Sequence, residues 1–264
     1  MPPTTPIDFE TPTPGMDPFH AQVGDLGIAY DVYSGGDGPG VILMHEIDGF
    51  KDHVEALANH LVGEGFTVYV PKFFSGFWAG LLKCVRREFI CVLGQRTSPI
   101  SYWVGELAAV ARQRDPEHRN VGVIGMCFSG GFALASLVTP GPVKAAVAAQ
   151  PAMPWAGPAW MFTRSRELDL GLDPVDLTTL KEELVAGTSR ALPLRFEKDW
   201  ICPRVRVDAI AEMDGAEPLH LVSGGGHPTL TKHFREGGDE DSLAAISETA
   251  SFLHDALDAP SNVD

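Results

Sequence analysis

One cysteine stands where a buried strand would turn sharply into a helix. The segment Val121-Gly-Val-Ile-Gly-Met-Cys-Phe-Ser-Gly-Gly131 begins as an apolar run and ends in small residues, followed by a helical pattern over 132–138. A strand, a tight turn that holds one reactive residue and a closely packed helix together form a nucleophile elbow. We therefore expect Cys127 to be a nucleophile whose thiolate is favoured by the helix start, in preference to a small buried structural residue.

Ser129, two residues further on, is the rival nucleophile. With Ser129 at the centre of the elbow, Cys127 would occupy a position where the motif requires glycine. The sequence therefore favours Cys127.

Two later loops carry the partners that a thiol nucleophile needs. The apolar run 192–196 is followed by Asp199, and the run 219–222 is followed by three glycines and His227. In an elbow enzyme the acid and the histidine follow the nucleophile in this order, each in a loop after a strand. We expect Asp199 to orient His227, which acts as general base, and Glu197 is the competing acid.

Six short β-rich runs alternate with helical patterns along the chain. The expected strands cover 41–45, 67–70, 121–125, 143–149, 192–196 and 219–222, and apolar stripes at helical spacing occupy 54–62, 100–111 and 243–257. Asp173-Pro174 reads as the N-cap and first residue of another helix that stops at Gly187. Gln22 to Tyr33 alternates like an antiparallel strand pair. The expected fold class is α/β, with a mainly parallel central sheet covered by helices on both faces.

The length, composition and net charge of the chain limit the number of domains and the kinds of binding partner that we expect. The chain has 264 residues, of which 44% are hydrophobic and 21% are charged, as in an ordinary globular protein. We expect a loose arm over 1–18 and one domain over 19–264, with a variable, lid-like segment around 75–98. The net charge of −15 disfavours binding to nucleic acid, since a phosphate backbone would be repelled.

Neither a membrane nor a metal is indicated. The N-terminal residues lack the basic and apolar regions of a signal peptide, and no apolar run is long enough to span a bilayer. The four cysteines lack paired metal-site spacing, and His45 has no second histidine four residues away. The expectation is a cytoplasmic protein without cofactor or metal, and the roles of Cys84, Cys91 and Cys202 stay open.

From about Phe19 to Leu257 the chain resembles the dienelactone hydrolases, or carboxymethylenebutenolidases, of the α/β-hydrolase superfamily. The resemblance rests on the motif His45-Glu46-Ile47-Asp48-Gly49 after the first core strand, the cysteine elbow, Asp199 in its loop, and Gly226-His227. It implies an α/β-hydrolase fold and a hydrolase that cleaves a small ester or lactone through a thioester on Cys127.

The resemblance also implies roles for residues outside the triad. Glu46 would lie against the resting thiol and receive its proton when substrate binds. The backbone N–H groups of Ile47 and Phe128 would form the oxyanion hole. Three arginines, each of which could equally lie on a surface helix, are candidates for binding a substrate carboxylate: Arg86, Arg87 and Arg96.

Two other classes of function remain possible at this stage. Class-I glutamine-amidotransferase-like thiol proteins also combine a cysteine elbow with an earlier glutamate, although they typically place a histidine beside the cysteine, where this chain has Phe128. The second is a catalytically weak binding or redox-sensing protein on the same scaffold. Hydrolysis of small aryl esters would separate this second class from the enzyme, which we expect to be a monomer or homodimer.

Overall fold

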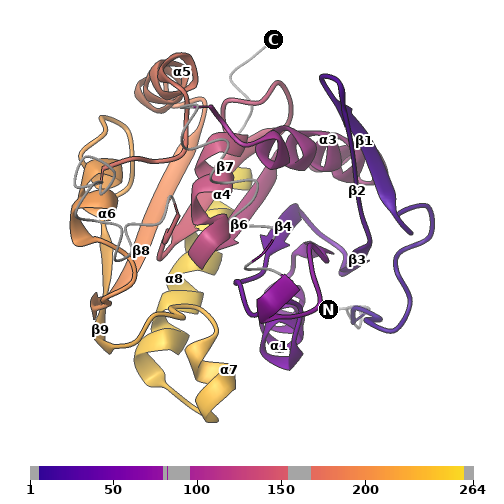
Figure 1. Ribbon diagram of the computed structural model, residues 1–264. Coiled ribbons are helices and arrows are strands. Elements are labelled where there is room, and N and C mark those ends of the chain that lie inside the picture. The colour runs from indigo at the N-terminus through magenta and orange to yellow at the C-terminus, as the bar shows by residue number, and fades with distance from the viewer. Residues whose placement is uncertain (1–5, 80–81, 83–95, 154–167, 259–264) are drawn as a thin grey trace.

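A parallel sheet forms the centre of the molecule (Figure 1). The computed structural model describes residues 6–79, 82, 96–153 and 168–258. Within this part of the chain, seven strands pair in the order β3-β5-β4-β6-β7-β8-β9, and β3 alone runs antiparallel, against β5. Their bounds are Val32–Gly35 (β3), Gly40–Met44 (β4), Thr67–Pro71 (β5), Val121–Met126 (β6), Val143–Ala149 (β7), Arg190–Lys198 (β8) and His220–Gly225 (β9).

Helices cover both faces of this sheet, which is why β4 and β6 are buried along their whole length. On one face, α1 (Asp52–Gly63) and α8 (Glu240–Leu257) pack through apolar side chains into one core cluster. On the other, α3 (Pro99–Arg114), α4 (Gly130–Ser136), α5 (Pro174–Val185) and α6 (Arg204–Ala211) share a second cluster. The predicted α/β class with a mainly parallel sheet is confirmed.

The strand runs and helical stripes seen in the sequence coincide with these elements, with shifted ends. Asp173 caps α5 by accepting hydrogen bonds from the N–H groups of Val175 and Asp176, and Pro174 is the first helical residue. The expected antiparallel pair is a separate two-stranded sheet of β1 (Phe19–Val23) and β2 (Leu26–Tyr30). The short elements β3, α6 and α7 (Lys232–Glu236) were not predicted.

The segment 6–18, expected as a loose arm, has no helix or strand but is fastened to the domain. Met16 is fully buried, and its carbonyl accepts a hydrogen bond from the N–H of Val32. The N–H of Ile7 donates to Asn59 of α1 at 3.2 Å. Of the lid-like segment around 75–98, residues 80–81 and 83–95 lie outside the described residues.

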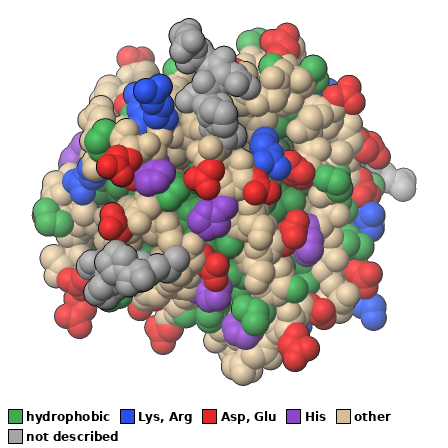
Figure 2. Space-filling view, turned by 180° about the vertical axis from the view of Figure 1, so that it is seen from behind, with side chains coloured by type: hydrophobic (Ala, Val, Ile, Leu, Met, Phe, Trp, Pro, Cys, Tyr) green, Lys and Arg blue, Asp and Glu red, His purple; other side chains and the backbone are tan. Residues whose placement is uncertain are grey.

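Acidic side chains are scattered over the face drawn in Figure 2 and do not form one continuous patch. In the part of the chain that the structure describes, no helix has both the length and the apolar character needed to cross a bilayer.

Candidate active site

The nucleophile elbow begins where β6 ends. Cys127 is buried and has a φ of 58°, in the left-handed region that non-glycine residues rarely adopt. A Cβ on Gly125 would lie 2.2 Å from the carbonyl oxygen of Ser129, and one on Gly130 would lie 2.9 Å from Pro151. Glycine at both positions therefore lets the chain turn this tightly, which is the local geometry that the sequence predicted.

Ser129, the rival nucleophile, holds the turn together. Its buried hydroxyl accepts a hydrogen bond from the N–H of Met126 at 2.9 Å and lies within reach of the carbonyls of Met126, Met44 and His45. These contacts link the elbow to the end of β4. They explain a serine at this position without any catalytic role for it.

The predicted acid and base lie together. Asp199, at the end of β8, places Oδ2 2.8 Å from Nδ1 of His227, and its side chain is fully buried. Its Oδ1 accepts hydrogen bonds from the N–H groups of Ile201 and Cys202 at 2.8 and 3.1 Å. Glu197, the competing acid, is exposed.

A buried arginine, Arg195, braces the loop that carries the acid. Its guanidinium donates to the carbonyls of Glu197, Asp199 and Cys202 at 3.2, 2.6 and 3.2 Å. Sequence reasoning missed this residue because it sits inside a strand run, where nothing in the pattern marks a side chain that turns back to a loop.

His227 arrives on the loop that follows β9. Gly226, just before it, has a φ of 135°, which favours glycine and lets the chain reverse toward the sheet. Nε2 of His227 is buried and has no hydrogen-bond partner among the described residues. With Nδ1 engaged by Asp199, Nε2 is the ring nitrogen left for proton transfer.

Glu46 occupies a buried position on the loop after β4. Its Oε1 accepts from Nε2 of Gln150 at 3.0 Å, and its Oε2 accepts from the hydroxyl of Thr231 at 3.1 Å and from the guanidinium of Arg235. Burial raises the pKa of Glu46 above its ordinary value, although the positive charge of Arg235 acts in the opposite direction. Arg235, on α7, was not among the arginines expected to matter.

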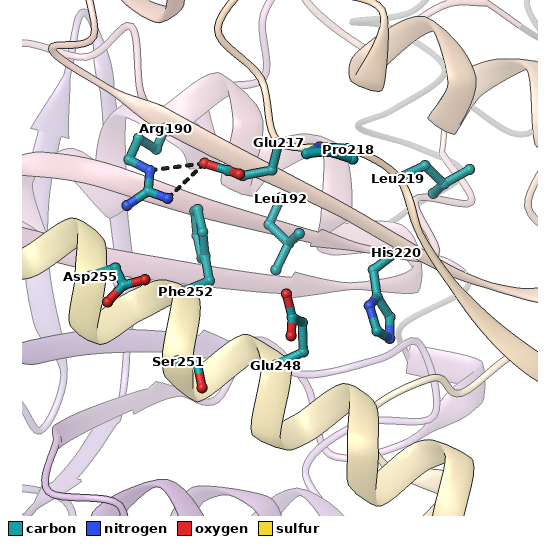
Figure 3. Close-up of a pocket in the computed structure, with 10 residues that line it drawn as sticks. All are labelled: Arg190, Leu192, Glu217, Pro218, Leu219, His220, Glu248, Ser251, Phe252 and Asp255. Carbon is teal, nitrogen blue, oxygen red and sulfur yellow. Dashed lines mark hydrogen bonds and ion pairs between the residues drawn. The ribbon is translucent and has the colours of Figure 1, made fainter.

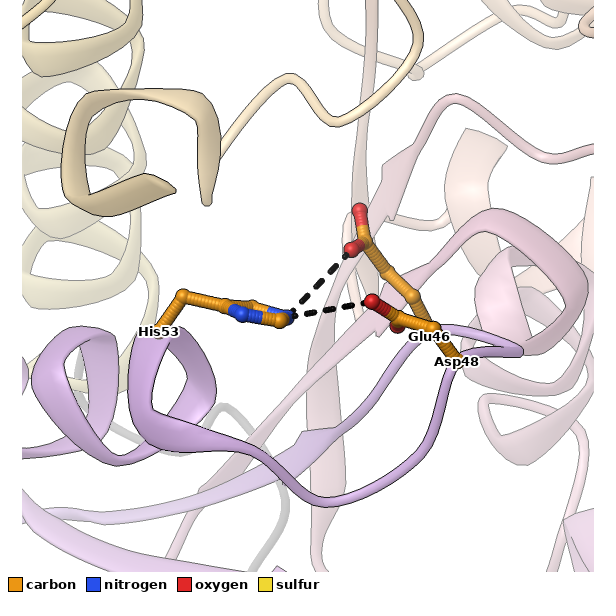
Figure 4. A group of neighbouring side chains, drawn as sticks. All are labelled: Glu46, Asp48 and His53. Carbon is orange, nitrogen blue, oxygen red and sulfur yellow. Dashed lines mark ion pairs between the residues drawn. The ribbon is translucent and has the colours of Figure 1, made fainter. Parts of the chain in front are cut away.

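Arg235 also binds a second carboxylate on the same loop, since Nη1 donates to Oδ2 of Asp48 at 2.9 Å. Burial opposes ionisation of Asp48, but Arg235 holds the pKa of that carboxyl below its usual value. His53 of α1 points at both carboxylates, with Nε2 3.6 Å from Asp48 and 4.0 Å from Glu46 (Figure 4). Burial, and then the charge of Arg235, lower the pKa of His53 to about 4.

Glu46, Asp48 and His53 each place one possible metal-ligating atom within 4.8 Å of the others. The guanidinium of Arg235 contacts both carboxylates and supplies positive charge at that place. A cation would have to compete with Arg235 for the same oxygens, so the arrangement is built as an ion-pair cluster.

The two expected oxyanion donors belong to this same region. Ile47 follows Glu46, and Phe128 follows Cys127 at the start of the elbow. His45, which directly precedes Glu46, is fully buried. It donates from Nδ1 to the carbonyl of Glu46 at 2.8 Å and accepts at Nε2 from the N–H of Phe73 at 3.1 Å. Burial lowers the pKa of His45 to about 4. The neutral ring therefore braces the backbone next to the proposed donors.

Of the three arginines expected to bind a substrate carboxylate, the structure describes only Arg96. Arg96 is exposed, while Arg86 and Arg87 lie outside the described residues, as do Cys84 and Cys91. Cys202 is buried, and burial together with the charge of Asp199 raises the pKa of its thiol to about 12. That thiol is poorly suited to nucleophilic chemistry.

A hollow of about 390 Å³ lies elsewhere, at the amino ends of β8 and β9 (Figure 3). Arg190 and Glu217 form an ion pair on its wall, and Glu248 and Asp255 of α8 face it. Because Asp199 and His227 follow the carboxyl ends of the same strands, this hollow is separate from the candidate active site.

The mainly parallel sheet covered by helices on both faces has the α/β-hydrolase fold, and it brings a cysteine turn and an Asp–His pair to the carboxyl ends of its strands. The family model of the dienelactone hydrolase family matches residues 29–164, just over half of the chain. The chain therefore belongs to the dienelactone hydrolase family and is a hydrolase. The matched segment contains Glu46 and Cys127 but ends before Asp199 and His227.

Solved structures share the fold at low sequence identity. A dienelactone hydrolase from Anabaena variabilis is 14% identical, with 90% of this chain and 96% of that chain covered and a TM-score of 0.61. A dienelactone hydrolase-like promiscuous phosphotriesterase from metagenomic libraries is 15% identical, with 90% and 96% covered and a TM-score of 0.61. An α/β-hydrolase from a lagoon-sediment metagenome of Mar Chica, Morocco, is 13% identical, with 89% and 100% covered and a TM-score of 0.50. Among curated proteins, none matches this sequence significantly.

Proposed function

We propose that this hydrolase cleaves a small ester or lactone, with Cys127 as nucleophile and His227 and Asp199 as its base and orienting acid. The observation that carries the proposal is the pairing of Asp199 with His227 at 2.8 Å on loops that follow β8 and β9, at the sheet edge where β6 ends in the strained Cys127 elbow. A thiol nucleophile, an oriented imidazole and a buried acid are the parts of a cysteine acyl-transfer site.

In the first half of the proposed reaction, substrate displaces the carboxylate of Glu46, which takes the proton of the Cys127 thiol. The sulfur attacks the ester carbonyl, and the N–H groups of Ile47 and Phe128 stabilise the oxyanion. Collapse of the tetrahedral intermediate breaks the C–O bond, and the alcohol oxygen leaves with the proton that Glu46 took from the thiol. In a lactone that alcohol stays attached to the acyl group.

In the second half, His227 removes a proton from water, and the resulting nucleophile attacks the thioester carbonyl. The C–S bond breaks, the acid is released, and the sulfur regains the proton that His227 took from water. The raised pKa of Glu46 supports its part in this cycle, because a carboxylate that is costly to keep ionised accepts a proton readily.

The remaining parts of the proposal concern setting and partners. We infer a cytoplasmic monomer or homodimer that acts on a small molecule, with no nucleic acid or membrane partner and with no cofactor. The segment around 75–98 would act as the lid of the single domain, and Arg86, Arg87 or Arg96 would bind an anionic group of the substrate. No observation favours the amidotransferase-like or redox-sensing alternative.

The test is a panel of aryl esters, simple lactones and a dienelactone, assayed with wild type and Cys127→Ala. We expect the wild type to hydrolyse at least one of them and the alanine variant to lose turnover while keeping its circular dichroism spectrum. A quenched reaction of the wild type should contain an acyl adduct on Cys127 by mass spectrometry.

Ser129→Ala is the matched control. It removes the rival hydroxyl but keeps the thiol, so an acyl adduct on Cys127 should persist in this variant. Unchanged turnover in Cys127→Ala, together with loss in Ser129→Ala, would reverse the assignment of the nucleophile.

A further inference from the structure

Gln150, the residue that follows β7, has an unusual backbone. Its φ is 38°, in the left-handed region, although it is neither glycine nor asparagine. Its N–H donates to the carbonyl of Leu194 in β8 at 2.7 Å, and two residues later the N–H of Ala152 donates to the carbonyl of Cys127 at 2.9 Å. A strained backbone that is tied to both the elbow and β8 fixes where the Gln150 side chain lies.

The Gln150 side chain is fully buried and reaches the carboxylate of Glu46. Its Nε2 donates to Oε1 of Glu46 at 3.0 Å, whereas its own Oε1 is buried and has no hydrogen-bond partner among the described residues. A buried carbonyl oxygen without a partner costs free energy. An apolar side chain of similar length would avoid that cost, so packing alone does not explain an amide at this position.

We propose that Gln150 is a positioning residue that holds Glu46 in both of its protonation states. This inference rests on the proposed function, in which Glu46 accepts the thiol proton. An ionised Glu46 needs a donor, which the NH₂ of the amide supplies. A protonated Glu46 presents an O–H, and a half-turn of the amide about its last side-chain bond brings the carbonyl oxygen to accept it.

Several other groups face Glu46 and set its charge balance. Arg235 and Thr231 bind its Oε2, Asp48 shares Arg235, and His53 lies 4.0 Å away. The charge of His227 also acts on Glu46. Arg235 favours the ionised form of Glu46, and Asp48 opposes it. The hydroxyl of Thr231 can donate or accept at Oε2, and the Gln150 amide is the group that can do the same at Oε1.

The experiment is a double-mutant cycle between Gln150 and Glu46, with the pH profile of kcat/KM for an aryl ester as readout. Gln150→Met removes both hydrogen-bonding groups at nearly constant length. Met leaves both protonation states of Glu46 without this partner, but the hydrogen bond to the ionised form is charge-assisted and is the stronger of the two. The pKa of Glu46 should therefore rise, and the acid limb of the profile should move to higher pH by about one unit. Turnover at neutral pH should fall about 10-fold.

The second half of the cycle separates positioning from packing. In a Glu46→Gln background, Gln150→Met should cause no further loss and no shift, because the group through which Gln150 acts is gone. Gln150→Glu, matched in size, should move the acid limb further upward in the wild-type background by adding a second carboxyl beside Glu46. Gln113→Met, which removes an exposed amide on α3, is the control and should match wild type.

Two results would overturn the proposal. One is an equal fold loss from Gln150→Met in both backgrounds, which is what a packing defect produces. The other is an acid limb that stays in place in both Gln150→Met and Gln150→Glu. If Gln150→Met does not fold, the position of the acid limb in Gln150→Glu tests the proposal by itself.

The pH profile of Cys127 alkylation by iodoacetamide, followed by peptide mass spectrometry, tests the same cycle without any substrate. A shift in Gln150→Met that is absent in the Glu46→Gln background supports the role of Gln150 even if no ester is hydrolysed. In that case the proposed function fails and the positioning role stands.

Discussion

The two oxygens of Asp199 have different tasks. Oδ1 accepts hydrogen bonds from two backbone N–H groups of its own loop, and Oδ2 lies 2.8 Å from Nδ1 of His227. In Asp199→Asn the two N–H donors would keep the amide oxygen, so the NH₂ would face Nδ1. His227 would then carry its proton on Nε2, the nitrogen that accepts a proton in the proposed reaction.

Asp199→Asn should therefore fold normally and lose on the order of 10²–10⁴-fold in kcat/KM for an aryl ester. Glu197→Gln is the control, because Glu197 is exposed at the end of the same strand. If the control loses activity and Asp199→Asn keeps it, the acid has been misassigned.

At the scale of elements, the elbow depends on how closely α4 approaches β6. A Cβ on Gly125 would lie 2.2 Å from the Ser129 carbonyl oxygen and 2.9 Å from Cβ of Ala133, and neither atom belongs to a flexible side chain. Strand and helix would have to separate. Gly125→Ala should lower the free energy of unfolding by at least about 2 kcal/mol and abolish hydrolysis.

Gly63→Ala is the matched glycine substitution, since a Cβ there meets nothing within 4 Å and the residue ends α1. It should be neutral or stabilising by up to about 1 kcal/mol. Urea unfolding of the two variants gives the comparison. Equal stability in both would mean that the elbow tolerates a wider turn than its contacts indicate.

The elements near the elbow are also where sequence reasoning succeeded best. The strands that lead to Cys127, Asp199 and His227 could be predicted because each is a short apolar run of consecutive residues. The residue of interest then follows within a few positions of the same run. Gln150, Arg195 and Arg235 were missed, because what matters is a contact made across the fold. Nothing in the spacing of Arg235 marks it as the partner of Glu46, 189 residues earlier.

For the whole molecule, the buried histidines couple stability to pH. The unfolded chain takes up a proton on His45 near pH 6.5, whereas the folded protein does so only near 4. The unfolded state therefore binds more protons between these values, and the free energy of unfolding decreases as the pH falls from 6.5 to 4. The loss from His45 is on the order of 3 kcal/mol over that range.

Guanidinium unfolding at pH 7 and pH 5 measures the part of this loss that falls above pH 5, about 2 kcal/mol. His45→Gln cannot take up a proton, so its stability should depend less on pH than that of the wild type. His20→Gln, at an exposed position on β1, should keep the wild-type dependence. If His45→Gln also keeps it, the buried ring is not the source of the acid sensitivity.

The ion pair between Glu46 and Arg235 also has a consequence during synthesis. A nascent chain that has emerged only as far as the family-matched segment 29–164 already contains β4, β6, β7 and Cys127. It lacks the guanidinium that neutralises Glu46, and enclosing an uncompensated carboxylate is costly. Arg235 lies on α7, which is synthesised after all seven strands of the described sheet. Sheet pairing can begin early in translation, but the ion pair that neutralises Glu46 forms only after α7 has left the exit tunnel.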